Sequence, residues 1–305
     1  MNVLVLGGNG FIGSYLVDIL VREGCDVSVY DMAEEKFRRP NSGVKYIQGS
    51  LLDYKKISES LKGIEVVYHL ISTTDPKTSM SDPSGDVSSN LLGSVNLLQE
   101  CVDKKVKKIV FISSGGTVYG IPERNPINEN AELNPICAYG ITKLAIEKYL
   151  EMFRVNYGLE YSILRPSNAY GPRQDPSGNV GAITLFIKNA IEKKKIVVWG
   201  DGSITRDYIF ASDVAEGIFK GSLIKESNIF NLGSGHGVSL NELIENIKRK
   251  LSLEFEVEYH PTRNYDVPQI YLDIARAREL INWEPKVSLN DGIQLTYDFL
   301  NRIIL

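Results

Sequence analysis

The sequence predicts an α/β protein with a doubly wound parallel sheet, joined to a smaller, interleaved C-terminal α/β domain. Short apolar runs alternate with amphipathic segments through the first half of the chain, which is typical of β-α-β units. The runs are continuously apolar, as expected of strands that helices cover on both faces. After residue 165 prolines and glycines become frequent and the alternation ends, which indicates a second domain.

The elements of the first half follow from these patterns. Residues 11–22 carry apolar side chains at helical spacing, and Asp53 is suited to cap the N-terminus of the next helix. We expect strands at residues 3–6, 26–30, 44–47, 66–70, 108–112 and 161–164. We expect helices at residues 11–22, 53–61, 88–102 and 139–157.

The second half contains fewer clear strands. Helices are expected at residues 183–191, 211–223, 240–251 and 276–281, and strands at residues 196–199 and 229–232. We assign residues 1–166 to the first domain and expect residues 211–232 to return to it. Residues 167–210 and 233–305 then form the second domain.

Composition excludes several classes of protein. The 305 residues include 34 Lys and Arg against 38 Asp and Glu, so a nucleic-acid partner is not expected. The three cysteines, Cys25, Cys101 and Cys137, are too scattered for a disulfide framework or a metal cluster. No stretch approaches the roughly 20 apolar residues of a membrane helix, and glycines interrupt the first apolar run, so no signal peptide is expected. These features predict a cytoplasmic protein without a metal.

A glycine-rich loop joins the first strand to the first helix. Gly7, Gly10 and Gly13 leave backbone room for a pyrophosphate, and Phe11 and Ile12 open the helix whose free N–H groups attract anions. The position of the loop between strand and helix is the one that a dinucleotide site requires. The first domain is therefore predicted to be of the Rossmann type.

One acidic residue indicates which dinucleotide binds. Asp31 closes the second strand, 18 residues after Gly13, where a carboxylate binds the adenosine ribose and repels a 2′-phosphate. This favours NAD as the cofactor. Arg38 and Arg39, which follow in the next loop, are the residues that would instead favour NADP.

Tyr139 and Lys143 form a candidate catalytic pair. They are four residues apart on a predicted helix and so share one face. A phenol has an unperturbed pKa of about 10, so it keeps its proton at neutral pH and cannot act as a base there. A neighbouring ammonium group and a bound nicotinamide cation would lower that pKa.

These motifs resemble the extended short-chain dehydrogenases/reductases, in the nucleotide-sugar epimerase/dehydratase group, and most nearly the UDP-glucose 4-epimerase type. The resemblance covers nearly the whole chain. It includes further motifs at residues 90–93, 113–120, 165–168, 202–208 and 263–266.

The resemblance implies roles for individual residues. Tyr139 would be the acid and base at the sugar hydroxyl, and Lys143 would hold the nicotinamide ribose. Further cofactor contacts are implied at Ser50, Leu51, Leu70, Asn90 and Ser113, with Ser50 standing where the family often has an acid. The implied binding residues for a UDP-sugar are Asn168 and Arg206 at the diphosphate, Trp199 at the uracil, Arg263 and Asp266 at the phosphate and ribose, and Ile270 near the sugar C2 substituent.

One departure from the family pattern concerns the sugar O4. Related 4-epimerases commonly have a serine at the position of Gly115, where its hydroxyl binds O4. Thr117 and Ser114 are the nearest hydroxyls that can replace it, and we favour Thr117.

The resemblance also limits which reactions of the family this chain is expected to catalyse. Dehydratases have Asp-Glu at the positions of Gly116 and Thr117, and UDP-glucuronate decarboxylases have Glu at the second. Neither acid is present here, which favours 4-epimerisation of a UDP-hexose through a transient 4-keto intermediate. A UDP-uronic acid 4-epimerase, another C4-oxidising nucleotide-sugar enzyme, or a non-enzymatic NAD-sensing scaffold are the alternatives. Glucose/galactose and the N-acetyl forms both stay open.

A homodimer is expected as well. The helices predicted at residues 88–102 and 139–157 carry more apolar residues than one face needs, among them Leu97, Leu98, Leu150 and Phe153. In the family this helix pair meets its copy across a two-fold axis. The alternative is that these residues only pack on the sheet.

Overall fold

A computed structural model describes residues 1–178, 180–262 and 267–304. Seven of the described strands form one parallel sheet in the order β11-β6-β5-β4-β1-β2-β3. Their bounds are β1 Asn2–Leu6, β2 Asp26–Asp31, β3 Lys45–Gln48, β4 Val66–His69, β5 Lys108–Ile112, β6 Glu160–Pro166 and β11 Asn228–Leu232. The predicted doubly wound α/β fold is confirmed.

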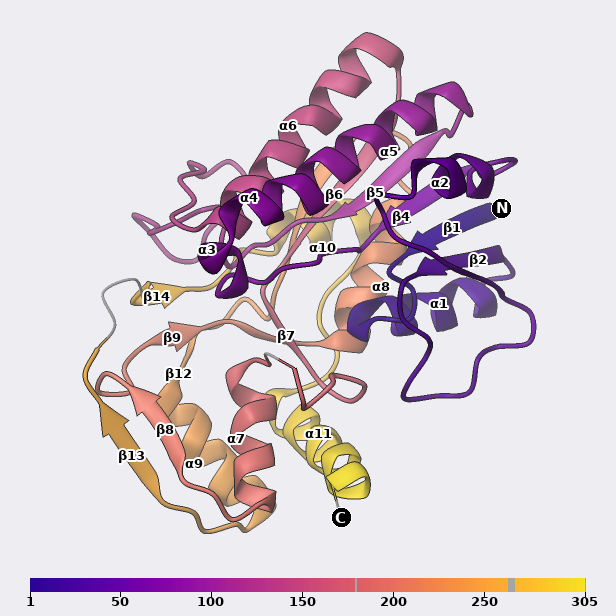
Figure 1. Cartoon of the computed structure of the whole chain (residues 1–305). Helices are drawn as coiled ribbons and strands as arrows, with labels where there is room; N and C mark the ends of the chain where they lie inside the picture. The colour runs from indigo at the N-terminus through magenta and orange to yellow at the C-terminus, as the bar shows by residue number, and fades with distance from the viewer. Residues whose placement is uncertain (179, 263–266, 305) are drawn as a thin grey trace.

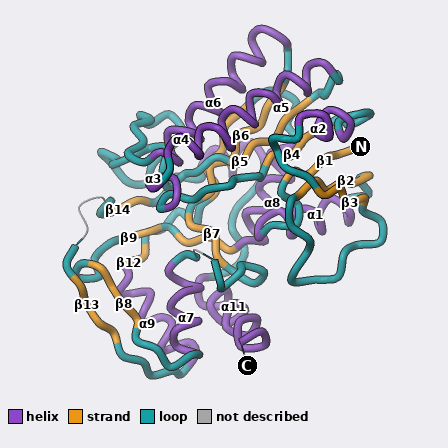
Figure 2. The backbone as a smooth tube through the Cα atoms, viewed as in Figure 1, coloured by secondary structure: helices purple, strands orange, loops and turns teal. Residues whose placement is uncertain are grey.

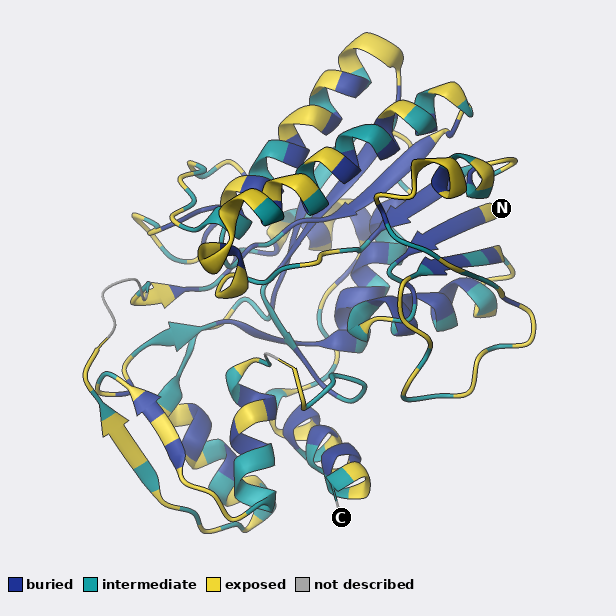
Figure 3. Cartoon of the chain, in the orientation of Figure 1, coloured by how far each residue is buried: buried dark blue, intermediate teal, exposed yellow. Residues whose placement is uncertain are grey.

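Helices cover both faces of this sheet (Figure 1). One face packs on α1 (Phe11–Arg22), α8 (Ala211–Ser222) and α10 (Ala275–Ile281), and the other on α2 (Tyr54–Ser60), α5 (Leu92–Asp103) and α6 (Ala138–Tyr157). Val3 and Val5 of β1 belong to the first core, whereas Leu4 and Leu6 belong to the second. Alternate residues of one strand thus face opposite layers, which is why the inner strands β4 and β5 are buried throughout and dark blue in Figure 3, whereas the edge strand β3 has no buried residue.

The segment between β4 and α5 differs from its prediction. The chain forms two short helices, α3 (Thr78–Ser81) and α4 (Pro83–Asp86), and then a π-helical turn, η1 (Val87–Leu91), that leads into α5. The sequence predicts one regular helix over residues 88–102. The local apolar spacing does not reveal the wider first turn, which carries the buried Asn90.

The second lobe contains α7 (Ala182–Ile191), α9 (Leu240–Leu251) and α11 (Leu289–Ile304), which lie side by side in Figure 2. The three helices share an apolar core. Small sheets lie within this lobe and between it and the first lobe. They pair β7 (Asn168–Tyr170) with β10 (Tyr208–Phe210), β8 (Ile196–Trp199) with β13 (Val257–His260), and β9 (Thr205–Arg206) with both β12 (Val238–Ser239) and β14 (Gln269–Ile270).

Residues 211–232 leave the second lobe again. Their helix α8 packs beside α1, and their strand β11 extends the central sheet next to β6. We therefore propose that this segment belongs to the first domain, with the second domain formed by the chain on either side of it.

The residues behind the dimer expectation need a correction. Leu97, Leu98, Leu150 and Phe153 are at most 3% exposed and pack in the core between the helices and the sheet. Other apolar side chains of the same helix pair are exposed, namely Leu92, Ile141, Tyr149, Met152 and Val155. An apolar outer surface therefore exists on this helix pair, but different residues form it.

The described helices and titratable side chains bear on the expectations about membranes and metals. Among the described helices, none has the length and apolar character that crossing a membrane requires. The described His, Cys, Asp and Glu side chains form no group of three that could hold a metal ion.

Candidate active site

The glycine loop between β1 and α1 is built so that only glycine fits at two positions. Gly7 has φ +84°, which side chains rarely adopt. A Cβ atom on Gly13 would lie 2.0 Å from the carbonyl oxygen of Gly7. Gly10 precedes α1, and no described side chain caps that helix end. The loop therefore leaves an open backbone cradle at a helix N-terminus, which fits a dinucleotide pyrophosphate.

Asp31 lies beside this cradle at the end of β2. Its carboxylate accepts hydrogen bonds from the backbone N–H groups of Asn9 and Ala33, each at 3.0 Å. Burial raises the pKa of Asp31, and the backbone hydrogen bonds oppose that rise. The side chain is thus fixed at one wall of a pocket of about 290 Å³ that Glu34 and Glu35 also line. Three carboxylates around one pocket disfavour a 2′-phosphate.

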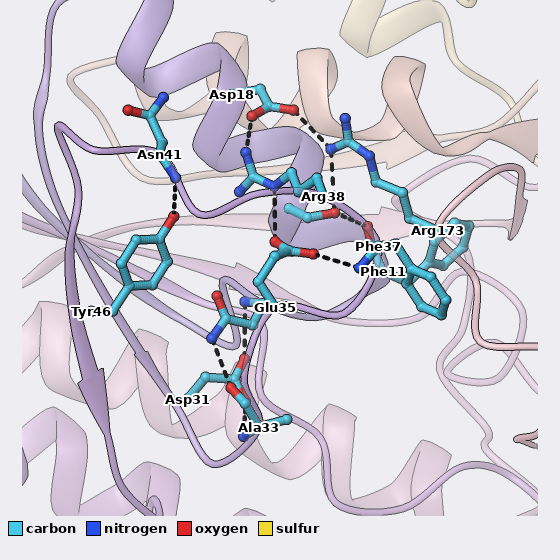
Figure 4. Close-up of polar contacts among 12 residues, drawn as sticks. Phe11, Asp18, Asp31, Ala33, Glu35, Phe37, Arg38, Asn41, Tyr46 and Arg173 are labelled. Atoms are coloured by element: carbon cyan, nitrogen blue, oxygen red, sulfur yellow. Dashed lines mark hydrogen bonds and ion pairs between the residues drawn. The ribbon is translucent and has the colours of Figure 1, made fainter.

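The arginine that would favour NADP is engaged elsewhere (Figure 4). Arg38 donates through Nε to Glu35 at 2.8 Å, and its Nη1 pairs with Asp18 of α1. Asp18 also pairs with Arg173, at 2.7 Å. The guanidinium of Arg38 is therefore tied to α1 and to its own loop, and the second arginine, Arg39, is exposed.

The side chains of several predicted cofactor residues form hydrogen bonds or packing contacts with other parts of the protein. The hydroxyl of Ser50 accepts the backbone N–H of Leu52, and the hydroxyl of Ser113 donates to Glu147. Leu51 is 3% exposed and packs in the core beneath α5. The remaining two are Asn90, a buried residue of η1, and the half-buried Leu70, which follows β4.

Tyr139 and Lys143 lie together on α6, as predicted. The Lys143 ammonium is 5.5 Å from the centroid of the Tyr139 ring and donates to the carbonyl of Ile112 at 2.9 Å. Burial lowers the pKa of Lys143 to about 8, against the opposing effect of nearby carboxylates. Burial raises the pKa of Tyr139 well above its usual range. Unless the nicotinamide cation of NAD is bound, Tyr139 therefore keeps its proton.

The loop after β5 shows which hydroxyl is available at this pair. A Cβ on Gly115 would lie 2.5 Å from Leu272 and 2.9 Å from the carbonyl oxygen of Arg165, so a serine does not fit there. The Thr117 hydroxyl is buried and has no hydrogen-bond partner in the described part of the chain. Buried hydroxyls are rarely left unpaired, so Thr117 is the hydroxyl of this loop that we consider for a contact with a ligand. Ser114 is half-buried.

Three of the predicted substrate residues come together. Ile270 of β14 lies opposite Arg206 of β9, and Asn168 donates through its side-chain amide to the carbonyl of Asp207 at 3.0 Å. Arg206 also donates to the carbonyl of Val267 at 2.7 Å. Ile270 itself is 3% exposed.

Trp199 belongs to a different small sheet, in which β8 pairs with β13. Trp199, at the end of β8, is 38% exposed, and its ring lies 5.1 Å from that of His260. Arg263 and Asp266 are outside the described residues.

Comparison with known proteins decides the family. The sequence pattern of the NAD dependent epimerase/dehydratase family matches residues 3–233. A putative UDP-glucose 4-epimerase of Methanocaldococcus jannaschii is 36% identical over 301 residues, which is 98% of each chain.

The chain belongs to the NAD dependent epimerase/dehydratase family.

Solved structures of family members agree. The UDP-glucose 4-epimerase of Thermotoga maritima, crystallised with UDP-glucose, is 36% identical, with a TM-score of 0.95 over 100% of both chains. That of Thermus thermophilus, crystallised with NAD, is 33% identical, with a TM-score of 0.91 over 98% of this chain and 99% of the other. The predicted family and the predicted NAD cofactor are confirmed.

Sequence reasoning missed the buried polar residues around the pair. Asp86 of α4 is 1% exposed and accepts hydrogen bonds from Asn90 and Thr142. Glu147 forms a buried ion pair with Arg165. Glu147 is on the Lys143 face of α6, four residues further on, and this spacing could have revealed it. No spacing links Asp86 to α6, because the chain brings them together from 56 residues apart.

Proposed function

We propose that this protein is a UDP-hexose 4-epimerase that works through a transient 4-keto sugar. The observation that carries the proposal is the loop at residues 115–117 beside Tyr139 and Lys143. It offers a threonine hydroxyl that has no hydrogen-bond partner among the described residues, and residues 115–117 include no carboxylate. A loop that places no second acid or base beside Tyr139 suits oxidation followed by reduction, and not removal of water.

Each side chain then has one task. NAD, when bound, supplies hydride acceptance and return at the sugar C4. Tyr139 takes the proton of the 4-hydroxyl and later returns it to the same oxygen on the other face of the ring. Lys143 lies beside the phenol and stabilises its ionised form. Thr117 binds O4, which keeps that oxygen near Tyr139.

The diphosphate end of the substrate fits the second lobe. The guanidinium of Arg206 provides fork-like donors suited to a phosphate, and Asn168 lies near it. With these groups fixed, the sugar can turn about the diphosphate and present its other face. The UDP-glucose 4-epimerase of Thermotoga maritima supports UDP-glucose and UDP-galactose as the first substrates to test.

The experiment is incubation with a panel of UDP-sugars, followed by NMR of the sugar C4 proton. The panel contains glucose, galactose, both N-acetyl forms and glucuronic acid. Inversion at C4 of a neutral hexose supports the proposal, whereas turnover of the uronic acid alone favours the uronic acid epimerase. Tyr139→Phe should lower kcat by about 10²–10⁴-fold and retain NAD. Bound NAD without turnover of any sugar would point to the scaffold alternative.

A further inference from the structure

The segment before η1 contacts the start of α6, the helix that carries Tyr139 and Lys143. α3 and α4 pack against the first turns of α6. The backbone N–H of Tyr139 donates to the Ser79 hydroxyl of α3 at 3.0 Å, and the Thr142 hydroxyl donates to Asp86 of α4 at 2.5 Å. These two contacts flank the turn that carries Tyr139 and leads to Lys143.

Asp86 is the centre of this contact. One carboxylate oxygen accepts hydrogen bonds from the Asn90 amide, at 2.9 Å, and from the Thr74 hydroxyl, and the other accepts from Thr142. The side chain is 1% exposed. A carboxylate is costly to bury unless several donors bind it. Here three donors from three segments do so, and the charge stays fixed beside α6.

We propose that Asp86 is a positioning residue of the reaction, which fixes the first turns of α6 and supplies the negative charge that balances the Tyr139–Lys143 pair. This role rests on the proposed function. The carboxylate opposes ionisation of the Tyr139 phenol and favours the charged form of Lys143. It therefore keeps the proton on the tyrosine until a bound cation and the substrate are in place.

Other groups act on the same pair and set the background for any change. They are His69 of β4, Asp75 of the loop after β4, Cys137 just before α6, and Glu147 of α6. Glu147 is neutralised by its ion pair with Arg165. Among the described residues Asp86 forms no ion pair within 4 Å: its direct partners are hydroxyl and amide donors, and its charge acts on Lys143 and Tyr139 from a greater distance.

The test removes the negative charge of Asp86 and keeps the shape of its side chain. In Asp86→Asn, loss of the negative charge should lower the pKa of both Tyr139 and Lys143. The pH profile of kcat should therefore move as a whole to lower pH by roughly one unit, the effect of one nearby charge. Asp86→Glu keeps the charge but displaces it, and should reduce kcat without moving the profile. Asp86→Ser provides a second neutral variant if the first does not fold.

Two controls separate positioning from stability alone. Thr142→Val removes one hydrogen bond and no charge, so it should lower kcat at an unchanged pH optimum. Asp213→Asn removes another buried carboxylate, which accepts the backbone N–H groups of Lys286 and Val287 in the α8 layer. It should lower the melting temperature and leave the profile in place.

A second readout does not depend on turnover. In the protein loaded with NAD, whose nicotinamide cation lowers the phenol pKa, NMR of tyrosine labelled with ¹³C at Cζ follows the Tyr139 phenol directly, with Tyr139→Phe to assign the signal. The titration should move to lower pH in Asp86→Asn and not in Thr142→Val. An unchanged Tyr139 titration in a folded neutral variant overturns the proposal. A wild-type protein that turns over no UDP-sugar refutes the proposed function instead, and the NMR titration still tests the electrostatic role of Asp86.

Discussion

Gly115 and Arg165 approach each other so closely that only glycine fits between the loop and β6. A Cβ on Gly115 would lie 2.9 Å from the backbone carbonyl oxygen of Arg165. That oxygen cannot move away easily, since the Arg165 side chain is 1% exposed and paired with Glu147. The serine that the family resemblance leads one to expect here is therefore sterically excluded, and under the proposed function the hydroxyl that binds O4 comes from another residue.

This steric argument predicts that restoring the serine is harmful. Gly115→Ser should destabilise the protein by about 1–3 kcal/mol, the usual cost of forcing atoms into a packed site. It should also lower kcat, because the loop that carries Thr117 must shift. Gly116→Ser is the matched control, since no described atom lies within 4 Å of a Cβ at that position. Urea unfolding and steady-state rates measure both effects, and a fully active, equally stable Gly115→Ser would refute the argument.

The same loop predicts a ranking of hydroxyl variants. Thr117→Val keeps the shape and removes the donor, so kcat should fall by about 10²–10³-fold if the bond to O4 acts mainly in the transition state. Thr117→Ser should retain most of the activity, and Ser114→Ala should cost much less than Thr117→Val. Steady-state kinetics on the best UDP-sugar gives the ranking. The reverse order of damage would assign the role to Ser114.

Cofactor choice is predicted from the ion pairs of Arg38. Denatured wild-type protein should release NAD or NADH, and NADP should bind weakly. Asp31→Ser with Glu35→Ala removes two carboxylates from the adenosine pocket and frees Arg38 from one partner. NADP affinity should then rise by roughly tenfold, as measured by calorimetry. Adding Arg38→Ala should remove the gain, whereas Arg39→Ala should not. An equal loss with either arginine would contradict the assignment.

Local patterns were sufficient where an element depends on its own residues. The predicted helices at residues 11–22 and 240–251 have the same bounds as α1 and α9. In α9 the Ser239 side chain and Glu242 form a capping box, so the start of the helix is encoded within four residues. Asp53 caps α2 as predicted.

Elements that depend on distant partners were missed. β9, β12 and β14 contain two residues each, and only their mutual pairing defines them. α11 is also missing from the elements that the sequence predicts, although its residues Ile293, Phe299 and Leu300 pack in the core of the second lobe. The glycine loop and the Tyr139–Lys143 pair were predictable because each is one local motif. Asp86 was not, because its partners come from separate segments.

Dimer formation is predicted from the outer surface of α5 and α6. Ile141 and Val155 are 56% and 66% exposed, and burying them against a second copy would remove apolar surface from water. Light scattering should give twice the mass of the chain. Val155→Asp or Ile141→Asp should shift the protein toward the monomer at micromolar concentration. Leu223→Asp, at an equally exposed apolar position after α8, should not. A wild-type monomer would refute the prediction.

From the burial of His69 we predict that the free energy of unfolding decreases at acid pH. It is 2% exposed at the end of β4, and its ring lies 2.8 Å from the Ser94 hydroxyl through Nε2. Burial, assisted by the Lys143 charge, lowers its pKa from the usual 6.5 to about 3. The unfolded chain therefore binds a proton below pH 6.5 that the folded protein excludes. The contribution of His69 to stability is complete above pH 6.5 and declines as the pH falls toward 3.

At pH 4.5 this linkage amounts to about 3 kcal/mol, since the folded and unfolded proteins differ by nearly one proton over two pH units. Carboxylates also titrate in this range, so the test compares variants at each pH. His69→Gln retains a polar group for Ser94 and has no titrating ring, and its free energy of unfolding should fall less than that of wild type between pH 7 and 4.5. His236→Gln, at an exposed histidine, should follow wild type. Parallel curves for wild type and His69→Gln would show that His69 is protonated in the folded protein.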